Sequence, residues 1–191
     1  MNNGKTNQNY NIMKKIVLIL LVAMLSLPAM AQNKKNNNPK QAKQPKVENT
    51  TEALPKVYDE SLNAMEQIDM ALDQARASGR KVICQVGGNW CPWCLRFANF
   101  ITTDPEIKQV VEKHYVYIHV NTSKENKNVE ALKRLGNPGR FGYPVFVILN
   151  KDGEVMHIQN SSYLEQDKSY DRKKVLDFFL NWTDEAIEKI K

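Results

Sequence analysis

The chain has 191 residues, a length typical of one domain with tails or of two small domains. Its 27 Lys and Arg side chains outnumber its 21 Asp and Glu side chains, but the excess lies before residue 57. Because residues 57–191 carry nearly equal numbers of both signs, a basic nucleic-acid-binding surface has no support, and we expect no nucleic acid among the partners. A content of 42% apolar and 8% aromatic residues is typical of a globular core and excludes a fibrous or wholly disordered chain.

The first recognisable pattern is a targeting signal. Two lysines precede an apolar run over residues 16–27, and small residues follow up to Ala31. This order predicts that residues 1–31 are an N-terminal extension and signal peptide, that the mature protein begins at Gln32, and that it is periplasmic or secreted. The run is shorter than the roughly 20 residues of a transmembrane helix, so we expect no stable membrane insertion after cleavage. An uncleaved anchor is the alternative.

Residues 32–57 are rich in Asn, Lys, Gln and Pro and nearly lack large apolar side chains. Such a segment cannot offset the entropy lost on ordering, so it is predicted to be a flexible polar tether between the signal and a domain over residues 58–191. A solvated tail without its own function is the simpler interpretation, and binding to an anionic envelope surface is the alternative.

The first half of this domain predicts helix, strand, helix, helix. Apolar residues at helical spacing, followed by a glycine, predict a helix over residues 64–78. The apolar run at 81–86 predicts a buried strand. Proline is favoured in the first turn of a helix, so the proline after Cys91 predicts a helix over 92–101, and an Asp-Pro pair predicts another over 105–113.

The second half continues with a β-rich segment at 115–120 and an amphipathic helix at 128–135. An apolar run at 145–149, a turn and an alternating segment at 154–159 predict a hairpin. The last pattern predicts a closing helix with one apolar face, which can continue through Ile187 and is formed by Val175, Leu176, Phe179 and Leu180. Strands separated by helices and ending in an antiparallel hairpin predict an α/β domain with a central mixed β-sheet flanked by helices on both faces.

Two of the three cysteines form Cys91-Pro92-Trp93-Cys94 where a predicted strand meets a helix. The positive end of the helix dipole and the free backbone N–H groups favour a thiolate at Cys91. Cys94 is one turn further on and can close or release a disulfide with it. The pattern therefore predicts thiol chemistry.

Two other interpretations are weaker. A purely structural disulfide closing so short a loop adds little stability. A zinc site needs four Cys or His ligands, and apart from the pair the chain offers only Cys84, His114, His119 and His157, without a second paired motif. We expect neither a metal nor a diffusible cofactor.

Two segments about fifty residues apart resemble the thioredoxin superfamily, in particular its secreted bacterial thioredoxin-like and disulfide-isomerase-like members. They are Gly88-Asn89-Trp90-Cys91-Pro92-Trp93-Cys94 and Gly142-Tyr143-Pro144-Val145-Phe146-Val147-Ile148-Leu149. The resemblance covers roughly residues 58–182 and implies a thioredoxin-like fold.

The resemblance also implies roles for five residues. Cys91 would be the attacking thiol and Cys94 the buried resolving thiol. Pro144 would follow a cis peptide bond and lie against the pair, and Tyr143 would offer backbone hydrogen bonds to an extended substrate. Trp90 would pack beside the site, although simple packing explains that residue equally well.

The sequence departs from the family at two positions. Pro92-Trp93 replaces the usual Gly-Pro between the cysteines. Gln85 occupies the position of a buried aspartate that accepts the proton of the resolving thiol, so we expect reduction through this pair to be slower than in a thioredoxin. Cys84 lies on the opposite face of the same strand and is expected to be an inert buried residue.

Two functions are compatible with these observations. The preferred one is a thiol-disulfide oxidoreductase of the cell envelope that exchanges disulfides with protein substrates and needs a separate redox partner. The alternative is a non-catalytic protein-binding module on a thioredoxin scaffold, in which the tail or the aromatic residues near Trp93 recruit another protein.

Overall fold

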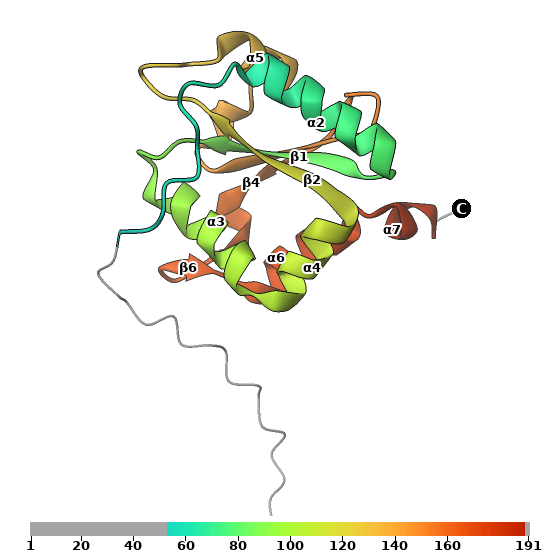
Figure 1. The fold of residues 1–191 in the computed structure, drawn as a ribbon. Coiled ribbons are helices and arrows are strands. Elements are labelled where there is room, and N and C mark those ends of the chain that lie inside the picture. Colours follow the sequence, from blue (N-terminus) through green and yellow to red (C-terminus); the bar gives the residue numbers. More distant parts are fainter. Residues whose placement is uncertain (1–52, 190–191) are drawn as a thin grey trace, which may run out of the picture. The chain divides into compact units, whose positions relative to one another are not determined.

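The computed structural model describes residues 53–189. The predicted signal peptide, its cleavage site and most of the predicted tether lie outside the described residues. Figure 1 shows the arrangement of the helices and strands, whose bounds are α2 Ala64–Ser78, β1 Lys81–Gly87, α3 Pro92–Thr103, α4 Pro105–His114, β2 Tyr115–Asn121, α5 Val129–Arg134, η1 Pro138–Phe141, β3 Val145–Leu149, β4 Val155–Asn160, η2 Ser161–Leu164, β5 Glu165–Gln166, β6 Ser169–Tyr170, α6 Arg172–Asn181 and α7 Asp184–Glu188. Between residues 53 and 189, no helix is both long and apolar enough to cross a membrane.

The main sheet has the strand order β2-β1-β3-β4. Strand β1 pairs parallel with β2 and antiparallel with β3, and β3 pairs antiparallel with β4. All seven residues of β1 are buried, as expected for a central strand covered on both faces. The predicted mixed sheet is confirmed.

The helices cover the sheet in two layers (Figure 1). Helix α2 packs on one face through side chains such as Ile68 and Leu72, together with residues of α5. Helices α3, α4 and α6 cover the other face, where Phe97 and Phe179 are fully buried. The helices on both faces agree with the prediction.

Alternation along β1 assigns its side chains to these two cores. Cys84 belongs to the cluster under α2, and Ile83 to the cluster under α3, α4 and α6. The neighbour of Cys84, Gln85, lies on the Ile83 face and is completely buried. A buried amide therefore lies directly beneath the helix that carries the cysteine pair.

The starts of the helices have local causes. The Asn63 side chain accepts the N–H of Met65 and caps α2, which ends at Gly79 with φ 67°. The Asp104 carboxylate accepts the N–H groups of Glu106 and Ile107 and caps α4, as the Asp-Pro pair predicted. These capping residues explain why the sequence located the helix boundaries well.

The C-terminal part differs from the prediction. The single closing helix through Ile187 is wrong, because α6 ends at Asn181 and the hydroxyl of Thr183 accepts the N–H of Ala186 to cap the separate helix α7. The short hairpin of β5 and β6 was not predicted either. It matters for the site, since Tyr170 in β6 packs against α3.

Candidate active site

Cys91 and Cys94 form a disulfide in the first turn of α3. Cys91 is the N-cap residue, with extended backbone angles, and the proline after it occupies the first helical position. The Cys91 Sγ accepts the backbone N–H of Cys94 at 3.2 Å. Cys94 is completely buried, whereas Cys91 keeps 5% of its surface exposed. The cysteine that caps the helix is therefore also the less buried of the two.

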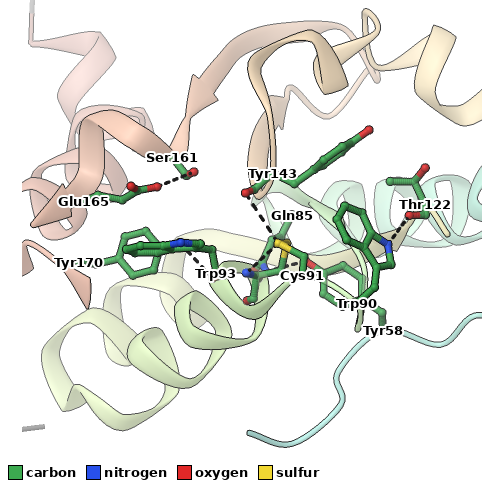
Figure 2. Close-up of a disulfide and its surroundings, with 11 residues drawn as sticks. Tyr58, Gln85, Trp90, Cys91, Trp93, Thr122, Tyr143, Ser161, Glu165 and Tyr170 are labelled. Atoms are coloured by element: carbon green, nitrogen blue, oxygen red, sulfur yellow. Dashed lines mark hydrogen bonds between the residues drawn. A yellow bond between two sulfur atoms is a disulfide. The ribbon is translucent and has the colours of Figure 1, made fainter. Parts of the chain in front are cut away.

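The loop before β3 brings Tyr143 to this disulfide (Figure 2). Val145, the first residue of β3, pairs with Val86 near the end of β1, and this antiparallel register places the loop beside the start of α3. The Tyr143–Pro144 peptide bond is cis, the isomer that the resemblance implied. The carbonyl oxygen of Tyr143 lies 3.7 Å from Cys91 Sγ. A backbone acceptor thus lies next to the sulfur that a substrate would reach.

Trp90 lies beside the disulfide and remains 54% exposed. Its indole N–H donates to the carbonyl oxygen of Thr122 at 2.8 Å, and its ring meets the Tyr143 ring edge-on with 5.5 Å between centroids. The hydrogen bond and the ring contact hold an exposed aromatic surface in place next to the disulfide.

Trp93 has a different environment from Trp90. It is half-buried and packs edge-on against Tyr170, whose hydroxyl donates to the Trp93 carbonyl oxygen at 3.0 Å. The guanidinium carbon of Arg96 lies over the Trp93 ring, 4.6 Å from the ring centroid. Trp93 therefore packs α3 against β6. The exposed tryptophan near the disulfide is Trp90.

Sequence reasoning missed a segment that precedes α2 and reaches the disulfide. Tyr58 is 4% exposed and clusters with Cys91 and Cys94. It is held by Asn89, whose side-chain oxygen accepts the N–H groups of Val57 and Tyr58, and whose amide donates to the Tyr58 carbonyl oxygen at 2.8 Å. Asn89 lies within the motif around the cysteines, and this position was the one available signal.

The side chain of Gln85 organises a buried polar group around Cys94. Its amide nitrogen donates to the Tyr58 hydroxyl at 2.7 Å and to the Cys94 carbonyl oxygen at 3.0 Å, and its oxygen accepts the Tyr117 hydroxyl at 2.6 Å. Burial raises the pKa of both tyrosines, so both are neutral at physiological pH. In the parallel pairing of β1 with β2, Gln85 pairs with His119, and Ile83 pairs with Tyr117. A correct prediction of this register from the sequence would have placed Tyr117 and His119 next to Gln85.

His119 completes the surroundings of Tyr58. The two rings meet edge-on with 5.2 Å between centroids, and the His119 Nε2 atom is buried without a hydrogen-bond partner among the described residues. Desolvation lowers the pKa of His119 to about 4, so the imidazole is neutral at physiological pH. The groups around Gln85 are therefore polar but uncharged.

Cys84 does not belong to the group of residues around the disulfide. It is completely buried on the α2 side of the sheet and is a free thiol. Desolvation raises its pKa to about 12, which leaves the thiol protonated at neutral pH. These properties agree with the predicted inert residue.

The chain is similar to known thioredoxin-like proteins. Residues 63–151 match the family model described as thioredoxin-like, a span that includes both cysteines and the Tyr143–Pro144 bond. A disulphide isomerase from Xylella fastidiosa Temecula1 is 24% identical, with a TM-score of 0.60 over 68% of this chain and 98% of that chain. No curated protein sequence matches the chain.

Two further solved structures are more distant. A thioredoxin from Thermus thermophilus is 23% identical, with a TM-score of 0.46 over 64% of this chain and 88% of that chain. The C-terminal domain of DsbD from Neisseria meningitidis, in its oxidised form, is 17% identical, with a TM-score of 0.44 over 65% of this chain and 97% of that chain. The thioredoxin-like fold is established by the sheet topology, the family model and the likeness to the disulphide isomerase.

Proposed function

We propose that this chain, which belongs to the thioredoxin superfamily, is a thiol-disulfide oxidoreductase that exchanges disulfides with protein substrates through Cys91. The observation that carries the proposal is the position of the Cys91 sulfur. It caps α3, accepts a backbone N–H and lies beside the Tyr143 carbonyl oxygen. If the two cysteines served only to pack the protein core, none of these three features would be needed.

Reaction begins with the reduced pair. The N-terminal end of α3 stabilises a thiolate at Cys91 through its dipole and the N–H of Cys94. An extended substrate would pair with the backbone of Tyr143 and present its disulfide to this sulfur. The Cys91 thiolate attacks one substrate sulfur, the substrate S–S bond breaks, and the other substrate sulfur leaves as a thiolate that takes up a proton.

The resolving step follows in the same site. Cys94 loses its proton and attacks Cys91, which releases the second substrate sulfur and leaves the disulfide between Cys91 and Cys94. The substrate has then gained two electrons, and the protein has lost them. The reverse sequence oxidises a substrate dithiol, so the direction depends on the redox partner that the proposal requires.

Trapping separates this function from a binding module. Replacing Cys94 by Ala removes the resolving thiol, so envelope proteins should accumulate as mixed disulfides on Cys91 and be released by a reducing agent. Cys91→Ala should trap almost nothing, and Cys84→Ala serves as the matched control with a cysteine removed elsewhere. If Cys94→Ala collects no mixed disulfide while the double Cys91→Ala, Cys94→Ala variant still binds a protein partner, the protein is a binding module.

We place this activity in the periplasm or outside the cell, on the basis of the charged and apolar pattern before Ala31. This segment lies outside the described residues. Exported protein should begin at Gln32 when its N-terminus is sequenced. Exported material that retains residues 14–31 would contradict the signal-peptide assignment and indicate a membrane anchor.

A further inference from the structure

The Tyr58 hydroxyl and the sulfur of Cys94 both lie close to Gly87. A Cβ atom placed on Gly87 would lie 2.5 Å from Cys94 Sγ and 2.9 Å from the Tyr58 hydroxyl oxygen. The sulfur and the oxygen therefore border the same small space above the bare Cα of Gly87. Figure 2 shows Tyr58 and Gln85 beside the disulfide.

The direction of the Tyr58 hydroxyl hydrogen follows from its other contact. The oxygen accepts a hydrogen bond from the Gln85 amide, which itself is fixed by bonds to the Cys94 carbonyl oxygen and the Tyr117 hydroxyl. The Tyr58 hydrogen must point away from the Gln85 amide. Among residues 53–189 no carbonyl or side-chain oxygen accepts the Tyr58 hydroxyl hydrogen, so this hydrogen can be donated toward the Cys94 sulfur.

Tyr58 has little freedom to move out of this position. Its backbone N–H and carbonyl oxygen are both bonded to the Asn89 side chain, which precedes Cys91 by two residues. The Asn89 amide also donates to the Glu60 carboxylate at 3.2 Å. The segment before α2 is thus fastened to the same loop that carries the attacking cysteine.

We propose that Tyr58 is a positioning residue whose hydroxyl donates a hydrogen bond to the Cys94 sulfur in the reduced protein and thereby makes the resolving thiol more acidic. The inference rests on the proposed exchange function. It concerns the step in which Cys94 gives up its proton to solvent and attacks Cys91. Tyr58 keeps its own proton throughout, and the substrate sulfur released from Cys91 takes up a proton.

The groups that surround Tyr58 and Cys94 leave this role to the hydroxyl. On β2 the facing titratable groups are Tyr117 and His119, and burial keeps both neutral at physiological pH. On β1 the facing group is Gln85, which does not titrate. In the turn before α3 it is Cys91, and Glu60 on the Tyr58 segment is exposed and bonded to Asn89. A hydrogen bond to a charged acceptor is stronger than one between neutral groups, so the Tyr58 hydroxyl should favour the thiolate.

The test measures the resolving step directly. Full-length protein is prepared with glutathione disulfide-bonded to Cys91, and the release of glutathione by Cys94 is followed against pH. Tyr58→Phe removes only the hydroxyl, so release should slow about tenfold at neutral pH, with its pH midpoint moved about one pH unit higher. The rate at which Cys91 attacks a disulfide should stay within twofold, which a general loss of structure would not permit.

Tyr117→Phe is the matched variant. It removes another buried hydroxyl from the same hydrogen-bonded group. The Tyr117 hydroxyl donates its hydrogen to the Gln85 side-chain oxygen, so this hydrogen is not directed at Cys94. Both variants should lower stability, and only Tyr58→Phe should slow release tenfold. Equal effects of the two variants, or an unchanged pH midpoint in Tyr58→Phe, would overturn the role of Tyr58. Failure of Cys94→Ala to trap any protein would instead overturn the exchange function, so the two failures are distinguishable.

Discussion

Gly87 offers a sharp test of the packing around Cys94. In Gly87→Ala the new methyl group would meet Cys94 Sγ at 2.5 Å and the Tyr58 hydroxyl oxygen at 2.9 Å, closer than real contacts of a Cβ atom. Neither neighbour is a free side-chain end, since the sulfur is in the disulfide and the hydroxyl is bonded to Gln85. The end of β1 is also fixed, because the Gly87 carbonyl oxygen accepts the N–H of Thr122 at 2.7 Å.

Overpacking of this kind costs about 1–3 kcal/mol. Replacing glycine by alanine also reduces the entropy of the unfolded chain, which returns about 0.4–1 kcal/mol where the backbone conformation suits both residues. We therefore expect the free energy of unfolding of the oxidised protein to fall by about 1–2 kcal/mol in Gly87→Ala. Urea denaturation of both proteins, with the disulfide intact, measures this difference.

A double-mutant cycle identifies the cause. Because the Tyr58 hydroxyl is one of the two atoms in the way, Tyr58→Phe should relieve part of the cost, and the two substitutions should couple by about 0.5 kcal/mol or more. Gly79→Ala is the control, since Gly79 has φ 67° with no atom within 4 Å of an added Cβ. It should lose about 1–2 kcal/mol through backbone strain alone and show no coupling to Tyr58. A Gly87→Ala protein as stable as wild type, without coupling, would refute the close approach of Cys94 and Tyr58 to Gly87.

Two further predictions concern residues outside the disulfide. Cys84 should resist a neutral alkylating agent at neutral pH until denaturant unfolds the protein, because this residue is completely buried and its pKa is raised to about 12. Mass spectrometry that finds Cys84 labelled in the folded protein would contradict this prediction. Burial alone would raise the pKa of the Asp104 carboxyl, but the N–H of Ile107 and the Arg172 guanidinium outweigh it and hold the pKa below its ordinary value. Its contribution to stability is therefore present above the pKa of the unfolded chain and lost as pH falls through the lower folded value, so Asp104→Asn should lower the urea midpoint at pH 7 and not in strong acid.

Much of the fold could be predicted because its signals are local. Helix α2 was predicted with the bounds that it has, since its apolar spacing ends at Gly79, where the left-handed conformation favours glycine. The prolines after Cys91 and Asp104 marked the starts of α3 and α4 for the same local reason. The cysteine pair was recognisable because both residues lie within one turn of helix.

The missed role of Tyr58 depends on contacts between distant parts of the chain. Tyr58 was assigned to the first residue of the domain without a role, because its partners Gln85 and Asn89 lie 27 and 31 residues away. Neither propensity nor periodicity contains such information. The break before α7, in contrast, has a local cause, because the Thr183 hydroxyl accepts the N–H of Ala186. It was missed because an apolar pattern continues across Thr183.

The two cysteines of the pair lie in different environments, and this difference supports the proposed order of attack. Cys91 caps a helix, accepts a backbone N–H and keeps some exposure to solvent, each of which favours its thiolate. Cys94 is completely buried beside the neutral side chains of Gln85 and Tyr58, and burial without a facing charge disfavours its thiolate. In the proposed exchange, a substrate disulfide should therefore meet its nucleophile at Cys91 first. Cys94 should react only when the mixed disulfide places an electrophilic sulfur within its reach.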